Sequence, residues 1–284
     1  MTTAEPLIRN ISDTARWAAA YRARESDRPD AIFRDPLARR LAGERGEQTI
    51  DAQPGGTRHS WAWVTRTWLF DHFIAQQVRE GADAVINLAA GLDTRPFRME
   101  LPASLKWVEV DLPELLEYKR EVLKGEKARC QLELAAVDLS DVGARRALFE
   151  GVGRRVKKVL VVSEGILIYL SAEEVASLAR DLASQPTFKR WVAEIASPGL
   201  LRMLQKQIGD LVGQGGASLK FGPEEGPEFF VPHGWKPVEV RSMLKTAARL
   251  RRLPLGLRFL SMLPSSNGRQ GSRPWSGVCL LDRN

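Results

Sequence analysis

A small-residue turn followed by a carboxylate is the part of this chain best suited to chemistry. The apolar run Asp83-Ala-Val-Ile-Asn-Leu88 leads into the turn Ala89-Ala-Gly-Leu-Asp93, and a second apolar run ends at Asp111. Asp111 lies 20 positions after Gly91. In doubly wound sheets, an acid about 20 positions beyond a glycine turn binds the hydroxyl groups of a ribose. The spacing therefore predicts a cofactor that contains a nucleoside.

The elements that position these residues alternate between strand and helix up to about residue 196. Helix starts are predicted at Leu112-Pro113-Glu114 and at Ser171-Ala-Glu-Glu174, which has the form of a capping box. Strands that alternate with helices imply crossover connections and a parallel sheet. The apolar runs predict strands at residues 84–88, 107–110, 132–137, 159–163 and 188–195.

The first 80 residues are predicted to be helical. Capping residues open a helix at 12–21, Asp35-Pro36 starts another that Gly43 can end, and residues 61–78 repeat apolar side chains with a helical period. Between the last two, residues 49–59 contain Pro54-Gly-Gly56 and predict a mobile loop.

Beyond residue 197 the pattern is less regular. We predict a helix at 197–212, a loop in the glycine-rich segment 213–227, and strands at 238–241 and 277–281. Ten Lys and Arg residues but only two acids lie between positions 236 and 284, which accounts for the net charge of +7. Such a region can contact nucleic acid, an anionic membrane or an acidic partner, or can simply be a solvated helix surface.

Composition narrows the class of protein. The chain has 284 residues, is 44% hydrophobic, and has no apolar run near the ~20 residues of a membrane span. Its first residues lack the pattern of a signal peptide, so we expect a cytoplasmic protein. Cys130 and Cys279 lie in strand-like runs and are expected to be buried and unpaired. Three scattered histidines predict no metal site.

Together, the motifs resemble the leucine carboxyl methyltransferase-like family, a branch of the class I S-adenosylmethionine (SAM)-dependent methyltransferases. The similarity covers about residues 10–200 and is weaker toward the end. Residues 21–30 and 33–37 are also similar to the bacterial members. Four segments carry the resemblance: Asn87-Leu-Ala-Ala-Gly-Leu-Asp-Thr-Arg95, Glu109-Val-Asp-Leu-Pro113, Val137-Asp-Leu139 and Ser163-Glu-Gly-Ile-Leu-Ile-Tyr-Leu170.

The resemblance implies an α/β Rossmann-like class I methyltransferase fold, with a seven-stranded, mostly parallel sheet and helices on both faces. We expect one domain over residues 1–284. Its expected parts are an N-terminal helical cap at 1–80, a SAM-binding core at 81–196, a lid inserted after the fifth strand at 197–235, and the rest of the sheet at 236–284.

The resemblance also assigns roles around SAM. Arg66 would bind its carboxylate, Glu164 its amino end, and Asp111 its ribose. Asp138 would accept from the adenine amino group, and Leu139 would support the ring. The full set expected to bind the cofactor is Arg66, Asn87, Ala89, Gly91, Asp111, Leu112, Asp138, Leu139, Glu164 and Gly165.

Structural roles remain open for the same residues. Asp111 can cap the helix before Pro113, Asp138 can stabilise a turn, and an arginine such as Arg66 usually extends to water. Asp93 can cap a short helix, and Arg95 is expected to pair with an acid at the sheet edge. The family has glycine where this chain has Ala89, and the cost is small only if Ala89 keeps a negative φ.

The implied activity is O-methyl transfer from SAM, which leaves S-adenosylhomocysteine. We expect a carboxyl or hydroxyl acceptor on a small apolar or aromatic metabolite, such as a polyketide-like product of secondary metabolism. The N-terminal helices and residues 197–235 would roof the acceptor pocket, and Tyr169 and His233 are the candidates for a catalytic role. The aromatic residues at 221, 229, 230 and 235 suit either an apolar acceptor or a lid that packs on itself.

Two other classes stay open. An NAD-dependent oxidoreductase would need a G-x-G-x-x-G loop, which Ala-Ala-Gly-Leu-Asp-Thr does not match. A non-catalytic module would bind SAM or nucleic acid, with the basic C-terminal region as its contact surface, although nucleic acid is the less expected partner. Alternatively, residues 245–258 would dock an acidic carrier protein that presents the acceptor, through Arg249, Arg251 and Arg252.

Overall fold

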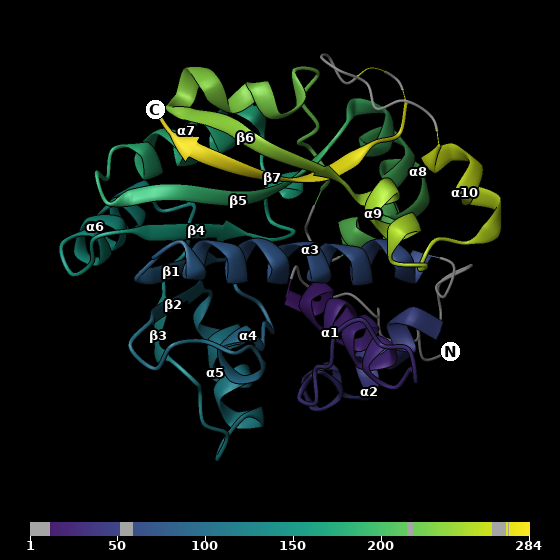
Figure 1. Ribbon diagram of the computed structural model, residues 1–284, viewed down its shortest axis with the longest axis horizontal. Coiled ribbons are helices and arrows are strands. Elements are labelled where there is room, and N and C mark those ends of the chain that lie inside the picture. Colours follow the sequence, from purple (N-terminus) through teal and green to yellow (C-terminus); the bar gives the residue numbers. More distant parts are fainter. Residues whose placement is uncertain (1–11, 52–58, 215–217, 263–270, 272) are drawn as a thin grey trace.

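A seven-stranded sheet forms the centre of the computed structural model, which describes residues 12–51, 59–214, 218–262, 271 and 273–284 (Figure 1). The strands run in the order β3-β2-β1-β4-β5-β7-β6, and only β7 is antiparallel to its neighbours. This architecture confirms the predicted fold class. The strands are β1 (Ala84–Leu88), β2 (Lys106–Asp111), β3 (Gln131–Ala136), β4 (Val159–Ser163), β5 (Phe188–Ala196), β6 (Trp235–Ser242) and β7 (Ser276–Arg283).

Helices cover both faces of the sheet, as the alternation of elements predicted. The predicted capping box opens α7, where the Ser171 hydroxyl and the Glu174 carboxylate each accept the other residue's amide. The helices are α1 (Ser12–Ser26), α2 (Ala38–Asp51), α3 (Ser60–Arg79), α4 (Arg95–Arg98), α5 (Pro113–Val122), α6 (Val142–Gly153), α7 (Ala172–Ala183), α8 (Pro198–Gln214), α9 (Met243–Arg249) and α10 (Leu255–Ser261), with 3-10 helices η2 (Leu167–Tyr169) and η3 (Gly226–His233).

Side chains alternate across each strand, so each face of the sheet has its own apolar core. One face of the sheet packs against α6, α7 and η3, and the other packs against α3 and α9. A third cluster joins α1, α2 and α5 around Trp17, Tyr21 and Leu41. In Figure 1, α3 runs along the sheet while α1 and α2 lie beyond it, so the N-terminal helices are packed near the ends of β1 and β2.

Two expectations for the N-terminal helices need correction. Gly43 does interrupt α2 with a kink, with φ at 60°, but the helix resumes after it and buries Gly46, Thr49 and Ile50. Residues 49–51, expected to open a loop, are the last residues of α2, where Thr49 and Ile50 are buried. The rest of that expected loop, 52–58, lies outside the described residues.

Not every arginine of the basic C-terminal region lies at the surface. Arg252 is 7% exposed and forms ion pairs with Glu25 at 2.8 Å and Asp30 at 3.1 Å. It therefore ties the segment between α9 and α10 to the end of α1, and it is not available to a docking partner. Cys279 is buried in β7, Cys130 is half-buried before β3, and both thiols are free, as expected.

Candidate functional site

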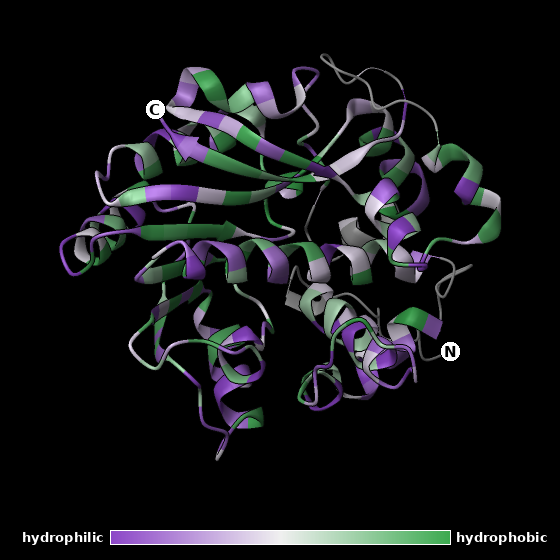
Figure 2. Cartoon of the chain, viewed as in Figure 1, coloured by the Kyte–Doolittle hydropathy of each residue, from purple (hydrophilic) through white to green (hydrophobic). Residues whose placement is uncertain are grey.

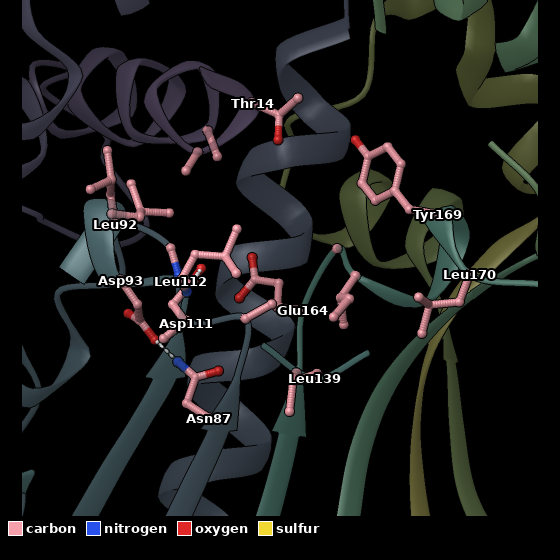
Figure 3. A pocket seen from close by; sticks show the side chains of 18 of the residues that line it. Thr14, Asn87, Leu92, Asp93, Asp111, Leu112, Leu139, Glu164, Tyr169 and Leu170 are labelled. Atoms are coloured by element: carbon pink, nitrogen blue, oxygen red, sulfur yellow. Dashed lines mark hydrogen bonds between the residues drawn. The ribbon is translucent and has the colours of Figure 1, made fainter. Parts of the chain in front are cut away.

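All ten residues predicted to bind the cofactor line one cavity of about 390 Å³ at the carboxyl ends of β1, β2 and β4. Figure 3 shows Asp111, Leu112, Leu139 and Glu164 around this space, with Tyr169 beside it. Ligands of doubly wound sheets bind at this edge, because the strand order reverses there and the loops diverge. The cavity thus lies where the spacing of Gly91 and Asp111 places a nucleoside.

The loop after β1 has a left-handed backbone at two positions. Gly91 has a φ of 55°, and a β-carbon added to it would lie 3.3 Å from that of Ala15. Ala89 has a φ of 50°. Its methyl group would cost little only at a negative φ, so that expectation is not met. An L-residue in the left-handed region costs about 1–2 kcal/mol. Ala89 therefore strains the loop.

Asp111 closes this loop onto β2. Its Oδ2 accepts from the Gly91 amide at 2.7 Å, and its Oδ1 accepts from the Leu112 amide at 2.8 Å. Burial raises the pKa of Asp111, and the two amide hydrogen bonds oppose that rise. A carboxylate has about four acceptor positions, so two remain for the hydroxyl groups of a ribose. The expected helix-cap role is met only through the Leu112 amide, since Leu112 itself is the N-cap of α5.

Asp138 and Leu139 follow β3 at the far end of the cavity. The Oδ1 atom of Asp138 accepts from the Ser140 amide at 2.8 Å, which is the turn that had been its alternative role. Leu139 packs against the core and lines the cavity, and its carbonyl accepts from Arg145 at 2.9 Å. The N-cap of the next helix is Asp141. An apolar side chain beside a fixed acid suits a flat heterocycle with an exocyclic amino group.

Arg66 does not extend to water. Its Nε donates to Glu164 at 3.0 Å, its Nη1 donates to Glu194 at 3.3 Å, and its guanidinium lies 4.5 Å from the centre of the Trp63 ring. Burial would lower the pKa of Arg66, but Glu194 and Glu164 outweigh burial and raise it. The cation is thus held at the cavity wall with its plane fixed.

Arg95 joins Glu164 to a second group of acids, which confirms its expected pairing at the sheet edge. It contacts Glu164 at 2.7 Å, Asp93 at 2.9 Å and Asp71 at 2.6 Å. Asp93 also accepts from the Arg95 amide at the start of α4, although the N-cap residue is Thr94. Asn87 completes the group by donating to Asp93 at 2.8 Å.

Sequence reasoning missed two acids of this network. Asp71 is the one acid of α3, and Glu194 is the one acid of β5. Asp71 and Glu194 are only 16% and 21% exposed, and an acid at such a site usually has a charged partner. The signal in the sequence that could have found them is a single acid within a mostly apolar stretch.

The two candidates for a catalytic role have different positions. Tyr169 lines the cavity, and burial raises the pKa of its hydroxyl, although Arg66 and a hydrogen bond with Thr14 oppose this. His233 lies at the end of η3, with its ring centre 5.2 Å from that of Phe229 and the two rings tilted, and it is not among the residues that line the cavity.

The expected aromatic lid belongs to the core. Phe221, Phe230 and Trp235 are buried, and Phe230 and Trp235 contact the ring of Trp191 in β5 edge to face. Phe229 is half-buried against the same cluster. No residue in the described part of 197–235 lines the cavity, so the expected roof from this segment is wrong. The N-terminal helices do contribute, as expected: α1 and α3 supply Thr14, Ala15, Ala18, Arg22, Trp63 and Arg66 to the cavity lining.

Among the residues that the structure describes, no group of three or more His, Cys, Asp or Glu side chains is placed to hold a metal ion. None of the helices in the described ranges combines the length and the apolar character needed to cross a bilayer.

The strand order, the single antiparallel strand and a cavity at the carboxyl edge define a class I methyltransferase fold. The chain belongs to the leucine carboxyl methyltransferase family, whose model matches residues 15–183, more than half of its length.

Bacterial relatives are similar over most of the chain. A protein of Parafrankia sp. strain EAN1pec, named for S-adenosyl-L-methionine-dependent methyltransferase activity, is 33% identical over 255 residues, which cover 85% of this chain and 82% of the relative. A protein of Frankia alni with the same type of name is 31% identical over 84% of this chain and 88% of its own length.

Solved structures agree on the fold. A methyltransferase-like protein of Thermobifida fusca superposes with a TM-score of 0.59 at 18% identity, covering 98% of this chain and 96% of that one. A DUF574 family protein of Streptomyces avermitilis has a TM-score of 0.59 at 12% identity over 95% of this chain and 97% of its own.

Proposed function

We propose that this protein transfers a methyl group from SAM to an oxygen atom of a small acceptor, most favourably a carboxylate. The observation that carries the proposal is the convergence of all ten expected cofactor residues on one cavity at the carboxyl edge of the sheet. Membership of a family described by carboxyl methylation supports the choice of acceptor atom.

The groups that line the cavity support an adenosyl sulfonium as the cofactor. Asp111 presents a carboxylate where a ribose would lie, and Leu112 and Leu139 offer apolar contact to a base. Glu164 and Asp93 add negative charge near the loop after β1, which favours a cofactor with an ammonium and a sulfonium group. Arg66 is placed to receive its carboxylate.

When bound, SAM supplies an activated methyl group whose carbon–sulfur bond breaks as a carbon–oxygen bond forms, with the electron pair passing to a neutral thioether. The protein must then hold the acceptor oxygen in line with that bond and exclude water. Ala15, Ala18 and Trp63 provide an apolar wall beside Tyr169 for the carbon skeleton of the acceptor. We expect the hydroxyl of Tyr169 to orient the acceptor oxygen.

The choice of a carboxylate follows from the groups that line the cavity. An ionised carboxylate attacks without losing a proton, whereas an alcohol or phenol is helped by a general base. Among the described residues, no histidine lines the cavity, and Tyr169 has a raised pKa. The alternative hydroxyl acceptor would have to rely on one of the acids that line the cavity. Each of these is already hydrogen-bonded or paired: Asp93, Asp111, Asp138, Glu164 and Glu174.

The decisive experiment is methyl transfer from isotopically labelled SAM to a panel of small apolar carboxylic acids and phenols. A methyl ester releases its label as volatile methanol in base, whereas a methyl ether does not. We expect the protein to transfer label to the carboxylic acids, and we expect base to release that label as methanol. Stable label on phenols would replace carboxyl by hydroxyl transfer, and binding of SAM without transfer to any acceptor would favour the non-catalytic reading.

A further inference from the structure

Helix α10 and the residue after it carry large apolar side chains that the fold does not cover. Leu255, Phe259 and Met262 are 72%, 76% and 78% exposed, and Leu260 is 50% exposed. No residue of α10 itself is buried. In Figure 2, α10 lies at the periphery of the molecule, away from the sheet, with mostly apolar colouring. We call these four side chains the apolar tip, and a patch of this kind on a soluble protein usually meets a partner.

The chain around the apolar tip is strongly basic. Residues 243–275 contain seven Lys and Arg residues and no acid. Arg249, Arg251 and Arg258 are exposed, and none of them forms an ion pair with an acid in the described residues. Arg252 differs, since it is directed inward to Glu25. Three cations that pair with no acid in the described residues therefore lie close to the apolar tip in the sequence.

We propose that this surface docks the protein on an anionic lipid bilayer. The apolar tip would enter the boundary between headgroups and acyl chains, while Arg249, Arg251 and Arg258 would bind lipid phosphates. Interfacial helices combine these two features, because apolar burial and attraction to anionic lipid act together. The proposal goes beyond the methyl-transfer function and does not depend on it.

Other occupants match only one of the two features. A second copy of this chain would bury the apolar tip but would place arginines against arginines. Nucleic acid would satisfy the arginines and leave Phe259 and Met262 exposed. An acidic carrier protein, expected from the charge of residues 245–258, needs no apolar tip, and one of its three expected contacts, Arg252, is internal.

The test is co-sedimentation of the whole protein with vesicles of phosphatidylcholine alone or mixed with phosphatidylglycerol. We expect binding to the anionic vesicles that is at least tenfold stronger than to the neutral ones. Phe259→Ser with Met262→Ser should weaken binding to anionic vesicles at least tenfold. Arg249→Glu with Arg251→Glu should weaken it at low salt and make it nearly independent of lipid charge.

A matched control removes exposed apolar side chains elsewhere. Val238 and Val240 in β6 are 47% and 43% exposed, and their double change to Ser should leave vesicle binding intact. SAM affinity and the melting temperature of every variant report folding and keep this test separate from the proposed function. The proposal fails if the protein does not bind anionic vesicles. It also fails if the serine changes at the tip have no more effect than the control, or if an acidic protein or duplex DNA competes while the tip variants bind normally.

Discussion

At the scale of single residues, the carboxylate of Asp111 has two roles, one in the structure of a loop and one in ligand binding. It holds the loop after β1 through the Gly91 amide and keeps two acceptor positions toward the cavity. A residue that shapes a loop and also binds ligand cannot be replaced by its amide, because an amide group would present donors to Gly91 or to the ligand.

We therefore expect Asp111→Asn to weaken SAM binding at least tenfold in calorimetric titration. Glu117→Gln, an exposed acid on α5, is the matched control and should bind as the unchanged protein does. Equal affinity of the Asp111 variant and the control would remove Asp111 from the cofactor site.

The strain at Ala89 predicts a substitution that improves the protein, because it should raise the free energy of unfolding. With φ at 50°, Ala89→Gly relieves a left-handed alanine, and this gain exceeds the extra entropy that glycine gives the unfolded chain. We expect the variant to be more stable by about 0.5–1 kcal/mol in urea denaturation, with SAM affinity retained or improved. Ala90→Gly, at the neighbouring buried residue with an ordinary φ, should instead lower stability. If both substitutions raised the stability, or both lowered it, Ala89 would not be strained.

At the scale of elements, the cavity depends on how α1 is held against the rest of the fold. One contact is remote from the cavity: Arg252, between α9 and α10, pairs with Glu25 near the end of α1. Both side chains are almost fully buried, and Glu25 also accepts from the Ile32 amide at 2.9 Å. Removing the arginine would leave this buried carboxylate with only the longer contact to the half-exposed Arg28, at 3.7 Å.

Arg252→Ala should destabilise the protein by about 3 kcal/mol, since breaking one half of a buried pair exposes the full desolvation cost of the other half. Thermal or urea unfolding measures this loss. Arg249→Ala removes an exposed arginine of the same segment and should change stability little. Neutralising the stranded acid, with Glu25→Gln and Arg252→Met together, should recover a large part of the loss. If Arg252→Ala were as stable as the Arg249→Ala control, the pair of Arg252 and Glu25 would not hold α1.

At the scale of the whole molecule, acids and arginines buried between α3, α4 and the sheet should set the response to low pH. Burial alone would raise the pKa of Asp93, but Arg95 and Lys119 outweigh it and lower the pKa to about 2. A carboxyl group whose pKa is depressed by folding stabilises the native state above its unfolded value, near 3.8, and that stability is lost as the pH falls toward 2.

Asp93 should therefore contribute about 2 kcal/mol above pH 5 that disappears between about pH 4 and pH 2. We expect the stability of Asp93→Asn, measured by urea unfolding across this range, to fall less steeply by that amount. Glu114→Gln, an exposed acid at the start of α5, should keep the slope of the unchanged protein. If the stability of all three proteins fell with pH along parallel curves, Asp93 would not be the titrating group.

Local sequence determined the elements and the order in which they follow one another. Five predicted strands, 84–88 to 188–195, agree with β1 to β5 within one residue at each end. The capping box at Ser171 and the proline start at 113 were also correct, because caps and apolar periodicity act within a few residues. Since parallel strands share one edge, the same signals sufficed to place Gly91, Asp111 and Glu164 around one cavity.

Only the tertiary structure decided how side chains meet across that edge. Arg66 is held by acids 98 and 128 positions away, so no local pattern could name Glu164 and Glu194 as its partners. The aromatic residues of η3 and its flanks fit a lid or a core equally well until Trp191 offered them a buried surface. Pairing and burial depend on which elements become neighbours in space, and that is a property of the packed molecule rather than of any segment.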